Sequence, residues 1–262
     1  MVKIDLITGF LGSGKTTFIK KYAKYLMAQG MNIGILENDF GAVNVDMMLL
    51  KDLEGDQCEL EMVAGGCDAD CHRRRFKTKL IAMGMCGYDR VIVEPSGIFD
   101  VDEFFDVLRE EPLDQWYEIG SVITIMNAKL EDTLSEEAEY LLASEAANAG
   151  CVVLSRSQDA SPEEIAKTRA HLNCALQAVH CSRQFGDEII EKNWEDFTEQ
   201  DLERIQNSGY HVEDYTKLHF PEEERFQSVC VMNQEMTRQE LEKKVQQLFA
   251  EASYGNVFRV KG

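Results

Sequence analysis

The stretch LITGFLGSGKTTF, residues 6–18, is the part of this chain that decides its fold. It contains the pattern G-x-x-x-x-G-K-T and joins an expected strand to an expected helix, which is the context of a phosphate-binding loop. The backbone amides of residues 12–17 should surround a β-phosphate, Lys15 should reach the β- and γ-phosphate oxygens, and Thr16 should ligate Mg²⁺. The alternative is a glycine-rich turn formed by chance. The residues expected to bind the phosphates are Gly9, Gly12, Ser13, Gly14, Lys15, Thr16 and Thr17.

Apolar strands alternate with helices on both sides of this loop, and this alternation predicts an α/β fold. Such spacing is typical of a mostly parallel P-loop NTPase sheet with helices on both faces. Helices are expected from the loop to about residue 30, over 74–86, and over 161–176, where Ser161 and Pro162 form a start signal. The expected strands span residues 2–8, 31–38, 58–64, 89–97, 121–128 and 151–157.

The alternation weakens after about residue 185, and three units are therefore expected. Residues 1–185 would form the P-loop nucleotide-binding domain, and 186–222 a helical connector or linker. Residues 223–262 read strand, helix, strand, which predicts a small α+β appendage.

The composition excludes several classes of partner. The 262 residues carry a formal net charge of −20, which repels phosphate backbones and anionic lipid, so neither nucleic acid nor membrane is an expected partner. No apolar run reaches about 18 residues, and the amino terminus does not resemble a signal peptide. The expected location is therefore the cytoplasm, where the eight cysteines should be thiols.

A second candidate for the phosphate site is VEPSG, residues 93–97, at the end of a strongly apolar strand. Glu94 would hold the water shell of Mg²⁺, and the Gly97 amide would sense the γ-phosphate. The alternative is that Glu94 is a surface residue at a strand end.

With the phosphate loop, ENDFGAVNVD (residues 37–46) and VEPSG, the chain resembles the CobW-like branch of the CobW/HypB/UreG family of SIMIBI-class GTPases. The resemblance implies GTP binding and hydrolysis, with a role in delivering metal to a client metalloprotein. It also implies that residues 37–46 and 94–100 respond to nucleotide, with Asp39 orienting the attacking water or the Mg²⁺ shell. The tail resembles the opening of the CobW carboxyl-terminal domain, so a truncated or minimal member is expected.

The chain departs from this family where the nucleobase should bind. The family motif N-K-x-D is replaced by Ser155, Arg156, Ser157 and Gln158. Glutamine offers one acceptor and one donor, which match adenine better than the paired donors of guanine. Asp159 follows one residue late and is an alternative acceptor. GTP is the expected nucleotide by resemblance, and ATP remains an alternative.

The stretch GGCDADC, residues 65–71, combines thiols with carboxylates. Cys67, Asp68, Asp70 and Cys71 offer ligands for Zn²⁺ or another divalent transition metal such as Co²⁺ or Fe²⁺. The family resemblance adds Glu37 as a further carboxylate ligand, although the family's C-x-C-C is not retained. The alternative is two packed cysteines one helical turn apart, with an aspartate capping the helix that follows.

Together these features predict an NTP-hydrolysing metallochaperone or metalloenzyme-maturation factor. Lys15, Thr16, Asp39 and Glu94 are the expected catalytic residues. The alternative is a nucleotide-dependent protein switch without metal transfer, and a third reading is a scaffold that binds nucleotide without turnover.

Overall fold

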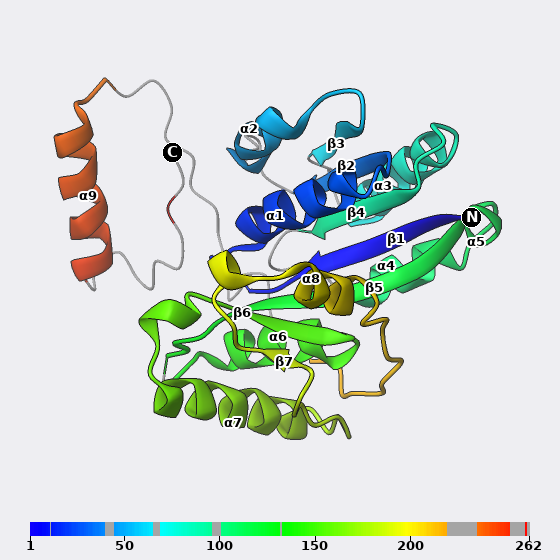
Figure 1. Cartoon of the computed structure of the whole chain (residues 1–262). Helices are drawn as coiled ribbons and strands as arrows, with labels where there is room; N and C mark the ends of the chain where they lie inside the picture. The colour runs from blue at the N-terminus through cyan, green and yellow to red at the C-terminus, as the bar shows by residue number, and fades with distance from the viewer. Residues whose placement is uncertain are drawn as a thin grey trace.

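The computed structural model describes residues 1–10, 12–39, 45–64, 69–95, 101–131, 133–218, 235–251 and 260. Within these residues the chain forms one seven-stranded sheet in the order β3-β2-β4-β1-β5-β6-β7, and every adjacent pair of strands is parallel (Figure 1). The strands are β1 (Val2–Thr8), β2 (Ile33–Asp39), β3 (Cys58–Ala64), β4 (Arg90–Pro95), β5 (Tyr117–Asn127), β6 (Cys151–Ser155) and β7 (Ile189–Ile190). The predicted α/β fold is thus confirmed.

Helices cover both faces of the sheet. On one face α1, α2 and α8 bury apolar side chains, whereas α3 to α7 cover the other. The described helices are α1 (Lys15–Ala28), α2 (Val45–Leu50), α3 (Ala69–Gly84), α4 (Val101–Leu108), α5 (Leu113–Trp116), α6 (Glu136–Ala147), α7 (Pro162–Ala178), α8 (Glu199–Gln206) and α9 (Arg238–Ala250), with short 3₁₀ turns η1 (Lys51–Leu53), η2 (Ser157–Asp159) and η3 (Trp194–Asp196).

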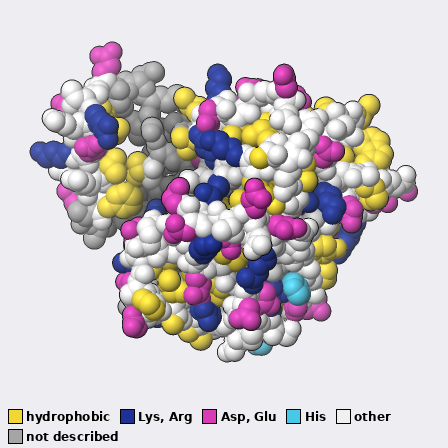
Figure 2. Space-filling view, viewed as in Figure 1, with side chains coloured by type: hydrophobic (Ala, Val, Ile, Leu, Met, Phe, Trp, Pro, Cys, Tyr) yellow, Lys and Arg dark blue, Asp and Glu magenta, His cyan; other side chains and the backbone are white. Residues whose placement is uncertain are grey.

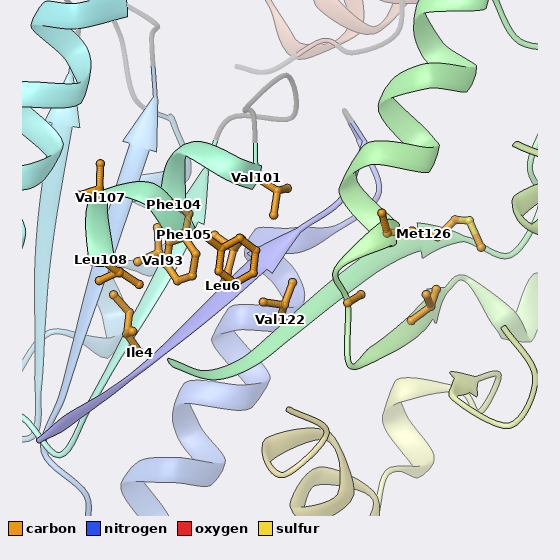
Figure 3. Packing of buried hydrophobic residues seen from close by; sticks show 14 of the residues in the cluster. Ile4, Leu6, Val93, Val101, Phe104, Phe105, Val107, Leu108, Val122 and Met126 are labelled. Carbon is orange, nitrogen blue, oxygen red and sulfur yellow. The ribbon is translucent and has the colours of Figure 1, made fainter. Parts of the chain in front are cut away.

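The central strands are buried on both sides, which explains their nearly continuous apolar sequences. Figure 3 shows how α4 packs Phe104 and Phe105 toward Leu6, Val93 and Val122 of the sheet. Helix α4 is amphipathic over only eight residues, and it was not among the expected elements.

The sheet continues past residue 185, where the first domain was expected to end. Strand β7 pairs with β6, and Leu202 and Ile205 of α8 join the same apolar cluster as α1. Residues 189–206 therefore belong to the same layered unit as the rest of the sheet rather than to a separate connector. The expected tail strands at 226–233 and 256–262 lie outside the described residues, apart from Val260.

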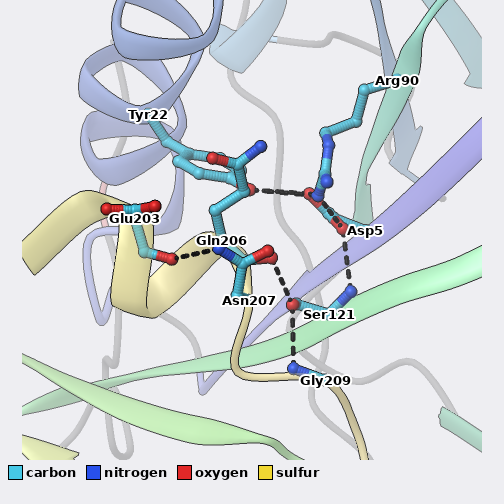
Figure 4. A network of polar contacts seen from close by, with 8 residues as sticks. All are labelled: Asp5, Tyr22, Arg90, Ser121, Glu203, Gln206, Asn207 and Gly209. Carbon is cyan, nitrogen blue, oxygen red and sulfur yellow. Dashed lines mark hydrogen bonds and ion pairs between the residues drawn. The ribbon is translucent and has the colours of Figure 1, made fainter. Parts of the chain in front are cut away.

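A buried polar network ties the middle of the sheet to the helices of one face (Figure 4). The fully buried Asp5 of β1 pairs with Arg90 of β4, whose Nη1 lies 2.7 Å from Oδ1 and 2.5 Å from Oδ2. Asp5 also accepts hydrogen bonds from the Tyr22 hydroxyl and the Ser121 amide, both at 2.8 Å. The Ser121 hydroxyl donates to the Gln206 carbonyl at 2.8 Å, so the network links strands β1, β4 and β5 with helices α1 and α8.

Charges on the surface are mixed. Figure 2 shows Lys and Arg interspersed with Asp and Glu over the visible face. Arg73 and Lys77 of α3, for example, both pair with Glu110, at 2.7 and 2.5 Å.

Candidate functional site

The loop after β1 has the backbone geometry of a phosphate cradle. Gly9, Gly12 and Gly14 have φ values of 138°, 77° and 102°, which side-chain-bearing residues rarely adopt. At Gly9 there is no room either, because a Cβ would lie 2.1 Å from the Ile125 carbonyl oxygen. The glycine spacing of the motif is therefore required by this loop.

Lys15 and the first turn of α1 provide the positive end of the cradle. No side chain caps α1, whose N-cap is Gly14, so the amides of its first turn are available to an anion. Lys15 is 4% exposed, and its Nζ donates to the Gly9 carbonyl at 2.7 Å, which folds the side chain over the loop. The buried Ser13 hydroxyl has no hydrogen-bond partner in the described part of the chain, as expected where a ligand supplies one.

Three buried carboxylates gather around Thr16. The Thr16 hydroxyl lies 3.0 Å from Asp46 Oδ1 and 3.0 Å from Glu94 Oε1. Glu37, Asp46 and Glu94 each offer a ligand atom, and these atoms lie within 4.8 Å of one another. Because Glu37 and Glu94 are paired residues of the adjacent strands β2 and β4, the sheet itself fixes their proximity.

The electrostatics of this cluster favour a bound cation. Burial raises the pKa of Glu94, and the neighbouring Asp46 raises it further, whereas Lys15 opposes both effects. Glu94 is 3% exposed, and a side-chain hydrogen bond with Glu37 lowers its pKa. Hard oxygen ligands of this kind suit Mg²⁺, so the residues present fit the expected ion.

The cluster extends the predicted Mg²⁺ site. Thr16 and Glu94 meet as expected, whereas Asp46 was not among the expected ligands although it is the last residue of ENDFGAVNVD. Glu37, expected among the transition-metal ligands, lies with the carboxylates beside Thr16. Gly97 and the side chain of Asp39 lie outside the described residues.

Glu145 of α6 is a further buried acid near the phosphate loop. It is 1% exposed, and among the described residues neither carboxylate oxygen has a hydrogen-bond partner. Burial raises the pKa of Glu145 to about 8, against the opposing charge of Lys15. No sequence motif marks this residue, because its environment is created only when α6 packs on β5, where Thr124 donates to the Glu145 carbonyl at 2.8 Å.

Replacing Glu145 by glutamine should stabilise the fold increasingly as pH rises. The folded-state pKa of about 8 lies above the ordinary value of 4.5, so between these values the unfolded chain releases a proton that the folded chain retains. Stability of the wild type therefore falls through this window, and Glu145→Gln removes the loss. In urea unfolding, we expect the free energy of unfolding of Glu145→Gln, relative to that of the wild type, to increase by about 2–3 kcal/mol between pH 5.5 and 7.5.

The exposed Glu136, in the first turn of the same helix, offers a matched control. Glu136→Gln should shift stability by a similar amount at both pH values. If Glu145→Gln changed the free energy of unfolding by the same amount at both pH values, the carboxyl of Glu145 would not be protonated in the folded protein.

The loop after β6, residues 155–159, is here called the base loop. Ser155 is buried and its hydroxyl has no hydrogen-bond partner within the ranges that the structure describes, whereas Arg156 and Gln158 are exposed. Arg156 has φ of 56°, and the Gln158 amide donates to Asp159 Oδ2 at 3.3 Å. A Cβ at Gly14 would lie 3.7 Å from Ser155 Cβ, so the base loop and the phosphate loop are neighbours.

The thiol-containing stretch is described only in part. Cys67 and Asp68, and the side chain of Asp70, lie outside the described residues. Cys71 is a half-buried cysteine in the first turn of α3. Strand β3 pairs with β2 up to the Asp39–Ala64 pair, so β3 ends at the same edge of the sheet as the carboxylates, and the thiol-containing stretch is the next segment in the sequence.

A parallel sheet with this loop, lysine and hydroxyl at the carboxyl end of β1 defines a P-loop nucleotide-binding protein. The family model described as "CobW/HypB/UreG, nucleotide-binding domain" matches residues 3–184. The chain therefore belongs to the CobW/HypB/UreG family.

Curated relatives carry names that concern zinc. "Zinc chaperone YeiR" of Escherichia coli is 28% identical over 167 residues, 62% of this chain and 49% of the relative. "Zinc chaperone YjiA" of Escherichia coli is 29% identical over 138 residues, covering 48% and 41%. "Zinc-regulated GTPase metalloprotein activator 1" of Schizosaccharomyces pombe is 22% identical over 200 residues, covering 72% and 48%. The chain spans about half the length of the curated relatives it matches.

Among solved structures, Zn(II)-bound YjiA GTPase from E. coli aligns with a TM-score of 0.41 and 21% identity, covering 65% of this chain and 54% of that one. Within the described part of the chain, no helix has the length and apolarity needed to cross a membrane.

Proposed function

We propose that this protein binds and hydrolyses a nucleoside triphosphate, with GTP the expected nucleotide, and uses it to control a divalent transition metal destined for a client metalloprotein. The observation that carries the proposal is the position of the Thr16 hydroxyl between Asp46 and Glu94. These two carboxylates belong to segments that continue into the loops expected to respond to nucleotide. The zinc-chaperone names of the relatives support the metal cargo.

Each residue has a role set by its place. The amides of the first turn of α1 and Lys15 bind the phosphates and neutralise their charge. Thr16, Asp46 and Glu94 would hold Mg²⁺, with Glu37 beside them, and the ion would supply charge neutralisation at the β- and γ-phosphates when bound. Asp39 is proposed to orient the attacking water, and Gly97 to sense the γ-phosphate.

Nucleotide and metal cargo are connected through the edge of the sheet. Strand β2 carries Glu37 and leads toward Asp46, while its partner β3 leads into Cys67 and Cys71. A change at the carboxylates on nucleotide binding would therefore be transmitted to the thiol stretch. Cys67, Cys71 and the aspartates Asp68 and Asp70 are the proposed ligands for Zn²⁺ or a similar ion.

A competition titration of the reduced protein with Zn²⁺ tests the metal role. We expect binding of one ion per chain, with an affinity that shifts about tenfold when Mg²⁺ and a non-hydrolysable GTP analogue are added. Cys71→Ala should abolish this binding, whereas Cys86→Ala should not, because Cys86 is an exposed thiol near the end of the same helix. Absence of Zn²⁺ binding with and without nucleotide would contradict the metallochaperone.

A second candidate is a nucleotide-dependent protein switch without metal transfer. Helix α2, which carries Asp46, exposes Met48 and Leu49 by 73% and 54%. A partner that bound these apolar side chains would respond to changes at Asp46 and Thr16, because Asp46 lies on the same helix. Retained partner binding by Cys71→Ala protein that holds no metal would favour this candidate.

Parallel titrations with GTP and ATP analogues test whether Gln158 makes the base loop prefer adenine.

A further inference from the structure

Trp194 joins two parts of the nucleotide site although it lies outside the segment matched by the family model, residues 3–184. It begins η3, four residues after β7. Because β7 is parallel to β6 and adjacent to it, the chain leaving β7 emerges beside the base loop. The indole lies against Gly14, directly before the start of α1.

The ring of Trp194 packs on the phosphate loop. A Cβ at Gly14 would lie 3.3 Å from Cη2 of the indole, which leaves no slack between the loop and the ring. Phe18, one turn into α1, meets the indole edge-on, with ring centroids 5.6 Å apart and planes at 66°. The aromatic contact and the close approach at Gly14 together fix the ring against the loop.

The nitrogen of the same indole is bonded to the base loop's strand. Trp194 Nε1 donates to the Leu154 carbonyl at 2.8 Å, directly before Ser155. This carbonyl also accepts from the Ser157 hydroxyl at 3.1 Å, within the base loop. The Leu154 carbonyl thus accepts hydrogen bonds from both Trp194 and Ser157, which couples the position of the indole to the path of the base loop.

The turn that presents Trp194 is itself firmly held. The Asn193 side chain accepts from the Glu195 amide at 3.3 Å, and Lys192 pairs with Asp201 of α8 at 2.6 Å. Thr198 and Asp201 form a capping box at the start of α8. Trp194 itself is half-buried.

We propose that Trp194 is a positioning residue that holds the phosphate loop and the base loop at the separation that one nucleoside triphosphate spans. Its ring packs against Gly14, and its N–H donates to the Leu154 carbonyl, which holds the end of β6 that carries Ser155. The affinity for the nucleoside part is then set by a residue beyond the matched family domain. This inference rests on the proposed nucleotide binding. Because Trp194 holds the two loops in place beforehand, less conformational entropy is lost when the nucleotide binds.

Calorimetric titration with two ligands separates the two contacts of Trp194. The ligands are a non-hydrolysable GTP analogue and inorganic tripolyphosphate, each with Mg²⁺, because tripolyphosphate has no base or ribose. Trp194→Phe keeps a ring behind Gly14 but loses the bond to Leu154. We expect it to weaken the GTP analogue about five- to tenfold and tripolyphosphate less than about twofold. Trp194→Ala should weaken both ligands.

Trp116→Phe is the matched control, since Trp116 lies in α5 against Gly84, away from the phosphate loop. It should change neither affinity. Equal losses for both ligands in Trp194→Phe, or no loss for either, would overturn the positioning role. If the wild type bound no GTP analogue, the proposed nucleotide binding would fail as well; wild-type binding with unaffected variants would refute the role of Trp194 alone.

Discussion

Replacing Arg90 by methionine is expected to destabilise the fold by about 3–5 kcal/mol, because Asp5 would stay buried without its counter-charge. Asp5 is 0% exposed and Arg90 is 3% exposed, so solvent cannot replace either partner. Burial raises the pKa of Asp5, and the Arg90 guanidinium is the largest opposing influence. Chemical denaturation at neutral pH measures the loss.

The pH dependence of the same variant has a defined sign. Without Arg90 the pKa of Asp5 should rise further above its ordinary value of 3.8, so the folded chain would keep a proton that the unfolded chain releases. Arg90→Met should therefore be less destabilised at pH 5.5 than at pH 7.5.

Two further variants complete this test. The double variant Asp5→Asn with Arg90→Met should recover part of the loss, since no unpaired charge remains. Arg109→Met, at a surface pair with Asp106 whose side chains are 64% and 57% exposed, should change stability by less than about 0.5 kcal/mol. A loss for Arg90→Met no larger than that for Arg109→Met would contradict the buried pair.

Replacing Lys15 by alanine is expected to reduce hydrolysis of the bound nucleotide by more than about 100-fold. The ammonium of Lys15 lies over the loop, 2.7 Å from the Gly9 carbonyl, where it can reach phosphate oxygens and neutralise charge that develops during transfer. Phosphate release from GTP in the presence of Mg²⁺ is the measurement.

Lys20→Ala provides the control, because Lys20 belongs to the same helix but pairs on the surface with Asp52 at 2.6 Å. Its turnover should match that of the wild type. Unchanged turnover in Lys15→Ala would rule out an NTPase that uses this loop, and equal losses in both variants would point to a disturbed α1.

The sequence predicted the elements whose signals are local. Strands β1, β2, β4, β5 and β6 were predictable because they are mostly buried, largely apolar runs, whereas β3 at the edge of the sheet exposes Glu59 and Met62. Helix α1 was predictable because it follows the phosphate-loop motif, and α7 because Ser161 and Pro162 form a start signal. Helix α6 was not predicted, because its residues 141–147 are buried all round and show no amphipathic period. Strand β7 has only two residues, and pairing with β6 alone makes it a strand.

The phosphate loop was determined by the sequence alone, because its chemistry depends on backbone angles and on residues adjacent in the chain. Tertiary structure decided the rest of the site. Glu37, Asp46 and Glu94 meet at Thr16 of α1 only because β2, α2 and β4 converge there. Trp194 reaches Gly14 only because β7 pairs with β6, so that the chain leaves β7 beside the base loop. Distances between segments far apart in the chain are set by packing, and no local pattern records them.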